Sequence, residues 1–257
     1  MTYLSSCKDC YTLYVENKLL FEFRGRIVHR INIKILDQDR FFLYIGRDTV
    51  GENNQKGIIF YHGSRSLAYE MLIATDFIKT FSGPIIFTQA SGDIIAPYIH
   101  EKFGDVSFGE LYFEIRDNLP QFTIDLEYTK YLIDYIKKTV KDIYFIGHSN
   151  GGIFGLLVLL WLPRNSIKAI ISHMGGIGWD SHYYLDFKDW DKIPKEELPN
   201  ILIYTGSEDS YKEPSLQAKR IFEAYDFKVD LFIEPNTKHV YNKNVADRVI
   251  LNWISSN

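Results

Sequence analysis

The stretch IYFIGHSNGGIFG, from Ile143 to Gly155, passes from a strand-like apolar run into a helix-like apolar run through a serine flanked by glycines. Its centre has the pattern G-x-S-x-G, in which Gly147 and Gly151 lack the Cβ atoms that would collide across a sharp strand-to-helix turn. Such a turn would lift the hydroxyl of Ser149 above a sheet, at the N-terminus of a helix. The N–H of Asn150 and the helix dipole could then face a negatively charged oxygen.

This pattern alone is a weak signal, because a chain of this length shows it by chance roughly one time in ten. A glycine-rich β-turn is the simpler interpretation. The context favours the strand-to-helix turn, since the β-branched and aromatic run before it and the long apolar run after it fit a buried strand and a buried helix.

Short apolar runs separated by segments of helical period predict an α/β fold, with a mostly parallel central sheet and helices on both faces. The expected parallel strands are Gly57–Tyr61, Pro84–Thr88, Ile143–Ile146, Ile167–Ser172, Ile201–Tyr204 and Val229–Ile233. The expected helices are Ala68–Phe81, Leu126–Val140, Gly151–Leu162, Pro214–Tyr225 and Val245–Ile254. Residues 1–50 alternate instead as an antiparallel meander, with strands over Thr12–Phe23, Arg26–Leu36 and Phe41–Ile45 and a break at Asp37–Arg40.

The length of 257 residues suits one α/β domain without metals or disulfides, so we expect a single domain over residues 1–257. Residues 90–121 and 175–198 fit neither the strand nor the helix period. Long irregular connections in a domain are usually functional loops, and we expect these two segments to form a cap or lid.

Charge and composition argue against several classes of function. The 29 basic and 33 acidic residues give a net charge of -4 without long runs of one sign, which disfavours nucleic acid as a partner. The N-terminus lacks the pattern of a signal peptide, so we expect a cytoplasmic protein. The longest apolar run, Ile153–Leu162, is too short to span a membrane. Cys7 and Cys10 lack the second ligand pair of a zinc site, and we interpret them as ordinary thiols.

A serine hydroxyl is a poor nucleophile unless a histidine accepts its proton and a carboxylate orients that histidine. Three histidines follow Ser149 in the sequence: His173, His182 and His239. Only His239 also follows a well-placed acid, because Asp209 comes just after the strand that ends at Tyr204, and His239 comes after the next strand. The carboxyl ends of parallel strands share one edge of a sheet, so the three side chains are expected on the same rim.

Each of these residues also has a simpler interpretation. Asp209 could be a turn or helix-capping residue, and His239 could lie in a surface loop. Glu208 and Asp180 compete for the role of the acid.

A second backbone donor for a negatively charged oxygen is expected in the loop after an early strand. Here the run Ile58–Tyr61 is followed at once by His62-Gly63-Ser64. Gly63 would allow a close backbone approach, and Ser64 could offer its N–H. An ordinary strand-to-loop turn is the alternative interpretation.

These motifs resemble those of the α/β-hydrolases, over most of the chain from about Gly57 to Trp253. The stretches FYHGS, GHSNGG, YTGSED and DLEYTKYLIDYI are similar to those of the polyhydroxybutyrate depolymerase and feruloyl esterase group, although relatives of that kind often carry Cys at the position of Ser64. The resemblance implies that Ser149 is the nucleophile, Asp209 the acid and His239 the base, with the N–H groups of Ser64 and Asn150 forming the oxyanion hole. LYFEIRD resembles the carboxylesterase and acyl-protein thioesterase branch instead.

We therefore expect a serine hydrolase that cleaves a carboxylic ester of a small or medium substrate through an acyl-enzyme. An acyl thioesterase or a serine peptidase would use the same three residues. A hydrolase-fold protein that binds a ligand without turning it over is the alternative from another class. No cofactor or metal is expected, because the sequence lacks the phosphate-binding glycine motifs and the H-E-x-x-H motif. The oligomeric state is not determined by any of these patterns.

Overall fold

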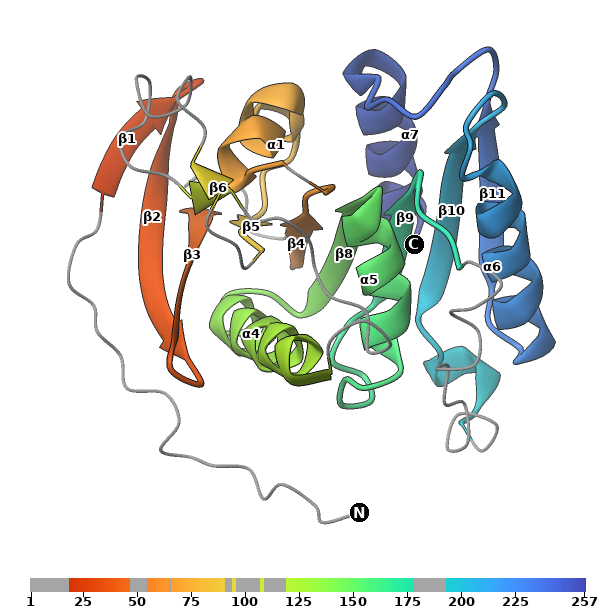
Figure 1. Ribbon diagram of the computed structural model, residues 1–257, viewed down its shortest axis with the longest axis horizontal. Helices are drawn as coiled ribbons and strands as arrows, with labels where there is room; N and C mark the ends of the chain where they lie inside the picture. The colour runs from red at the N-terminus through yellow and green to blue at the C-terminus, as the bar shows by residue number, and fades with distance from the viewer. Residues whose placement is uncertain are drawn as a thin grey trace.

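A nine-stranded sheet forms the centre of the computed structural model, which describes residues 19–46, 55–64, 66–90, 94–95, 107–108, 119–177 and 193–257 (Figure 1). The first three strands and β5 pair antiparallel, and the strands from β5 to β11 pair parallel. In spatial order the strands are β1 (Leu19–Phe23), β2 (Arg26–Ile35), β3 (Gln38–Ile45), β5 (Ile85–Thr88), β4 (Lys56–Tyr61), β8 (Asp142–His148), β9 (Ala169–His173), β10 (Asn200–Gly206) and β11 (Val229–Glu234). The predicted mostly parallel sheet with an antiparallel N-terminal part is confirmed.

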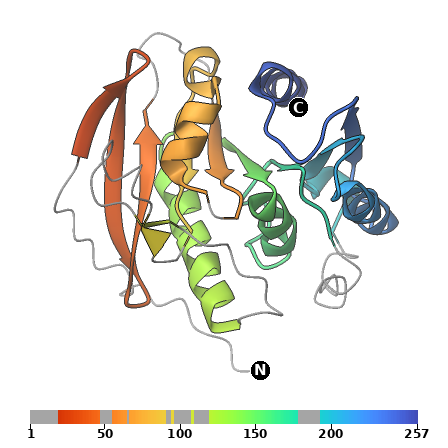
Figure 2. The ribbon, with the colours of Figure 1, turned by 45° about the horizontal axis from the view of Figure 1, so that its top comes forward.

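Helices cover both faces of this sheet. They are α1 (Ala68–Ala74), α2 (Phe77–Thr80), α4 (Leu119–Lys137), α5 (Asn150–Leu159), α6 (Lys212–Ala224) and α7 (Lys243–Ser256), with a 3-10 helix at Lys195–Glu197. Residues of α4, α5 and α6 belong to one buried apolar cluster, and residues of α1, α2 and α7 belong to another. Figure 2 shows β10 and β11 between α6 and α7.

Both faces of the central strands are apolar, which explains why these strands read as continuous apolar runs. In β8, Ile143 and Phe145 face the first cluster, whereas Tyr144 and Ile146 face the second. All four side chains are at most 1% exposed. A strand buried on both sides is the expected state of a parallel sheet covered by two helical layers.

The break predicted at residues 37–40 is wrong in its position. Leu36 and Asp37 both have positive φ, at 45° and 69°, and form a two-residue turn. Pairing resumes at once, with Ile35 opposite Gln38, so β3 begins before the predicted Phe41. Two consecutive residues with positive φ match the right-handed twist of a hairpin, and this turn does so without the glycine that usually signals it.

The single helix predicted over residues 68–81 is also wrong, because α1 and α2 are separate. Arg24 from the β1–β2 turn donates to the carbonyl oxygens of Ile73 and Thr75. The carboxylate of Asp247 in α7 accepts the N–H of Asp76. These groups from distant parts of the chain bind the backbone atoms between the two helices, so the helix ends where its own sequence pattern would continue.

Helix α4 begins at Leu119, inside a segment that lacked a clear period. Pro120 lies in the first turn of this helix, where a missing N–H costs nothing. Most of the two predicted cap or lid segments lies outside the described residues, as do Cys7, Cys10, Asp180 and His182. Within 90–121, β6 (Ile94–Ile95) and β7 (Ser107–Phe108) pair antiparallel.

None of the described helices is both long enough and apolar enough to cross a membrane.

Candidate active site

Ser149 occupies the turn between β8 and α5, as predicted. Its backbone has φ 53° and ψ -118°, a strained conformation for a residue with a side chain. The N–H of Ser149 donates to the carbonyl of His173 on β9 at 2.8 Å, and its own carbonyl accepts from two N–H groups of α5. The surrounding hydrogen bonds therefore hold the strained residue in place.

Glycines make this turn possible by removing side chains from contacts between backbone atoms. A Cβ on Gly147 would lie 2.1 Å from the carbonyl oxygen of Gly151. A Cβ on Gly151 would lie 2.5 Å from the carbonyl oxygen of His62 and 2.6 Å from that of Tyr61. The G-x-S-x-G pattern thus reflects close packing of the turn against itself and against the end of β4.

The structure brings Ser149, His239 and Asp209 together in one chain of hydrogen bonds. The Nε2 atom of His239 lies 2.8 Å from the Oγ of Ser149, and its Nδ1 lies 2.9 Å from the Oδ1 of Asp209. A carboxylate can only accept, so Nδ1 carries the proton and Nε2 is free to accept the proton of the serine hydroxyl. This arrangement can convert the hydroxyl into a nucleophile.

Asp209 and His239 are held together by contacts between their loops. The N–H of Glu208 donates to the carbonyl of Thr237 at 3.0 Å, and the N–H of Asn236 donates to the Oγ of Ser207 at 2.8 Å. A Cβ on Gly206 would lie 2.1 Å from the same Thr237 carbonyl oxygen. The loop after β10 and the loop after β11 are therefore in direct backbone contact.

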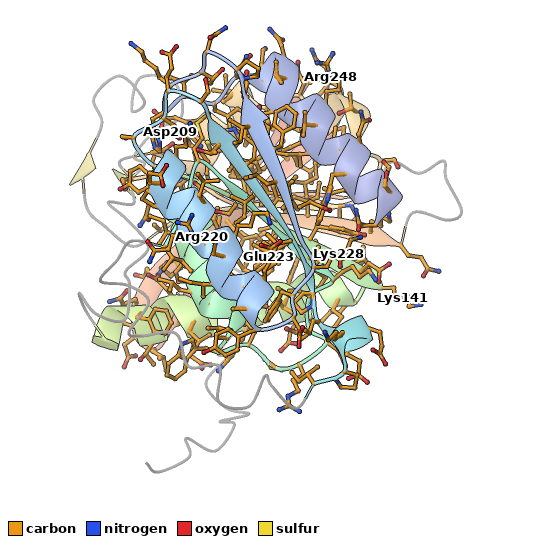
Figure 3. The ribbon with its side chains drawn as sticks, turned by 90° about the vertical axis from the view of Figure 1, so that its right-hand side faces the viewer. Lys141, Asp209, Arg220, Glu223, Lys228 and Arg248 are labelled. Atoms are coloured by element: carbon orange, nitrogen blue, oxygen red, sulfur yellow. The ribbon has the colours of Figure 1, made fainter. Side chains whose placement is uncertain are left out.

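The carboxylate that contacts His239 is that of Asp209, and not that of Glu208. Its side chain is fully buried, whereas Glu208 is exposed, and its Oδ1 also accepts the N–H of Tyr211 at 2.8 Å. Its Oδ2 is buried and has no hydrogen-bond partner among the described residues. In Figure 3, Asp209 lies at one end of the sheet, and Lys141 and Lys228 lie at the other, so the site occupies the carboxyl-terminal rim.

The loop predicted to supply a second backbone donor lies beside the serine. A Cβ on Gly63 would lie 3.2 Å from the Cβ of Ser149, and the next residue, Ser64, is exposed. His62 is fully buried; its Nδ1 donates to the carbonyl of Gly63 at 2.6 Å, and its Nε2 accepts the N–H of Ala90 at 3.0 Å. Burial lowers the pKa of His62 from 6.5 to about 4, so the ring is neutral and can both donate and accept.

A buried ion pair supports this loop from behind. The guanidinium of Arg40 on β3 lies 2.6 Å from the carboxylate of Asp125 on α4, and both side chains are at most 2% exposed. Arg40 also donates to the carbonyl of Gln89 at 3.0 Å, next to the Ala90 N–H that binds His62. The N-terminal part of the sheet is thereby connected to the loop that faces the serine.

A pair of histidines, His148 and His173, lies beneath His239. The Nδ1 atoms of His148 and His173 are 2.9 Å apart, so one proton lies between them. The ring of His148 stacks on that of His239 with centroids 5.8 Å apart. Burial lowers the pKa of His148 to about 3 and that of His173 well below 6.5, so both rings are neutral near pH 7.

The sequence patterns did not favour His173 as the base, and they gave no role to Tyr211 or the Arg40–Asp125 pair. The position of His173 at the end of an apolar strand was the available signal, because that strand lies next to the one that carries Ser149. Tyr211 and the ion pair gave no signal, since the ring of Tyr211 contacts the distant His239 and the two members of the ion pair lie far apart in the sequence. Among the described residues, no group of three or more His, Cys, Asp or Glu side chains could hold a metal ion.

Comparison with known proteins gives one curated relative and several solved structures. No protein-family model matches the sequence. An uncharacterized hydrolase of Acanthamoeba polyphaga mimivirus is 27% identical over 209 residues, which are 73% of this chain and 66% of that protein. The chain thus spans just under two thirds of the length of this relative.

The structural neighbours are hydrolases and esterases of low sequence identity. An S-formylglutathione hydrolase from Agrobacterium tumefaciens has a TM-score of 0.64 at 14% identity, covering 91% of this chain and 96% of that chain. An esterase from Pyrobaculum calidifontis has a TM-score of 0.63 at 12% identity, covering 89% and 84%. The Pyrococcus furiosus esterase Pf2001 has a TM-score of 0.61 at 13% identity, covering 96% and 97%. With the sheet order described above, these neighbours show that the chain has the α/β-hydrolase fold.

Proposed function

We propose that this protein is a serine hydrolase that cleaves carboxylic esters of small or medium substrates. The observation that carries the proposal is the chain of two hydrogen bonds from Ser149 through His239 to Asp209, at 2.8 and 2.9 Å. Three residues from three separate loops have the order and geometry of a catalytic triad. The names of the structural neighbours and of the curated relative support the same class of activity.

In the proposed mechanism, His239 accepts the proton of Ser149 as the serine oxygen attacks the ester carbonyl. Asp209 holds the imidazole in the required tautomer and stabilises the imidazolium that forms. The N–H groups of Asn150 and Ser64 are proposed to bind the negatively charged oxygen of the tetrahedral intermediate. The alcohol then leaves with the proton from His239, and water releases the acyl group from Ser149 in a second cycle of the same steps.

Replacement of Ser149 by Ala tests the nucleophile. Turnover of p-nitrophenyl butyrate and labelling by a fluorophosphonate probe should both be lost, because only an activated serine reacts with the probe. Asp209→Asn should reduce kcat by about 10⁴-fold, since the histidine would adopt the wrong tautomer. The matched control Glu208→Gln changes an exposed neighbour and should retain wild-type turnover.

The alternatives predict different outcomes of this experiment. A ligand-binding protein without activity would leave Ser149 unlabelled in the wild-type chain, which would contradict the proposal. A thioesterase would be labelled but would prefer S-acyl over O-acyl substrates of the same acyl group. A thioesterase is the second candidate because one of the structural neighbours is an S-formylglutathione hydrolase.

A further inference from the structure

The alcohol part of the substrate must lie beside His239 if the proposed function holds. The base that takes the proton of the serine returns it to the leaving group, so the leaving oxygen lies within hydrogen-bond reach of His239 Nε2. The side chains that border the ring of His239 on its exposed side are therefore in position to contact the group attached to that oxygen. The His239 side chain is 31% exposed.

One exposed aromatic side chain borders this ring, and an exposed valine follows His239 in the sequence. Tyr211 lies with its ring centroid 5.1 Å from that of His239, at an interplanar angle of 37°, and is 37% exposed. Val240 follows His239 directly and is 53% exposed. The backbone at Tyr211 is held by its N–H bond to Asp209, and the backbone at Val240 by the 2.8 Å bond from its N–H to the carbonyl of Lys238.

The location of these side chains is unusual within the described part of the chain. The large apolar side chains that are exposed there are Ile27, Leu36, Trp161, Tyr211, Tyr225, Ile233 and Val240. Of these, Tyr211 and Val240 belong to the loops that carry the acid and the base. A substrate that covers them removes apolar surface from water and gains aromatic contact with Tyr211.

We propose that Tyr211 and Val240 form a leaving-group subsite that selects esters whose alcohol part is an apolar ring, such as a benzyl or aryl group. This inference rests on the proposed esterase function and adds the class of alcohol. The ring of the alcohol packs on the exposed face of Tyr211 and against Val240, while its oxygen takes the proton from His239. The acyl group contributes nothing to this selection, because it lies on the other side of the cleaved bond.

Two esters with the same acyl group test the subsite. Benzyl butyrate and ethyl butyrate form the same acyl-enzyme, so the ratio of their kcat/KM values reports contacts with the alcohol alone. Tyr211→Ala should lower the ratio of benzyl to ethyl butyrate by about tenfold, the loss of one aromatic contact with its buried area. Tyr211→Phe should keep the ratio, and Val240→Ser should lower it about threefold.

Tyr225 provides a matched control, because it is an equally exposed tyrosine that follows the opposite end of the same helix. Tyr225→Ala should leave both kcat/KM values unchanged. In Tyr211→Ala, an unchanged ratio of the two kcat/KM values would overturn the subsite. If both values fall by the same factor, Tyr211 positions His239 instead. If the wild-type chain hydrolyses neither ester and Ser149 is not labelled by a fluorophosphonate, the proposed function itself fails and the subsite with it.

Discussion

Replacement of Gly151 by Ala should separate the integrity of the turn from the integrity of the fold. The added Cβ would lie 2.5 Å from the carbonyl oxygen of His62 and 2.6 Å from that of Tyr61. Ordinary contacts between such atoms are about 3.5 Å, so the end of β4 and the turn must separate by roughly 1 Å. The atoms in contact are backbone atoms of a paired strand, and no side-chain rotation can relieve them.

The expected cost follows from this displacement. Overpacking of this kind lowers the free energy of unfolding by about 1–3 kcal/mol. The effect on turnover should be larger, because Ser149 lies two residues before Gly151 in the same turn and must stay 2.8 Å from His239 Nε2. A misplacement of about 1 Å at a reacting group costs about 10²-fold in rate. The loop that contains Gly63 follows the same end of β4 and would move with it.

Gly155 in the same helix is the matched control. A Cβ on Gly155 would meet nothing closer than 3.7 Å, the distance to the Cγ2 of Ile170. Gly155→Ala should therefore keep full turnover and gain up to about 1 kcal/mol from helix propensity. Both variants are compared by urea unfolding, by kcat/KM and by the rate of fluorophosphonate labelling. If Gly151→Ala matches Gly155→Ala in stability and labelling rate, the packing argument is wrong.

Two further predictions concern stability. Burial lowers the pKa values of His62, to about 4, and of His173, so unfolding takes up protons below pH 6.5. The free energy of unfolding should be greatest above pH 6.5. It should fall as the pH drops toward 4, by about 3 kcal/mol for His62 alone. Equal urea midpoints at pH 7 and pH 5 would contradict this prediction. Asp125→Asn removes a carboxylate 2.6 Å from a buried guanidinium and should lower the free energy of unfolding by about 3–5 kcal/mol. Glu127→Gln on the same helix is the control and should cost at most about 1 kcal/mol, because its lysine partner is partly exposed. Similar losses in these two variants would refute the importance of burial.

Local sequence patterns predicted the strands of the central sheet and the main helices that pack on it. The continuous run of Ile, Tyr and Phe in β8 reflects burial between two helical layers, and the 3.6-residue period of the apolar residues located the main helices. The motif around Ser149 was predictable because its glycines serve a local turn. The positions of Asp209 and His239 could be predicted because the carboxyl ends of parallel strands lie at one edge of the sheet.

Contacts between distant parts of the chain could not be predicted from the sequence. The end of α1 depends on Arg24 and Asp247, which lie far from it in the sequence and bind its free backbone groups. The turn at Leu36 forms because β2 and β3 pair tightly, and a leucine with positive φ gives no warning of it. The error at α1 comes from tertiary contacts that override a local preference.

The register of the parallel strands connects these local and distant features at the site. His148 is opposite His173 between β8 and β9, and His173 is opposite Tyr204 between β9 and β10. A shift by one residue would turn each side chain to the other face and would remove the histidine pair from beneath His239. The 2.8 Å hydrogen bond from the N–H of Ser149 to the carbonyl of His173 holds β8 and β9 in this register. The backbone pairing of the strands therefore also positions Ser149 for its 2.8 Å contact with His239 Nε2.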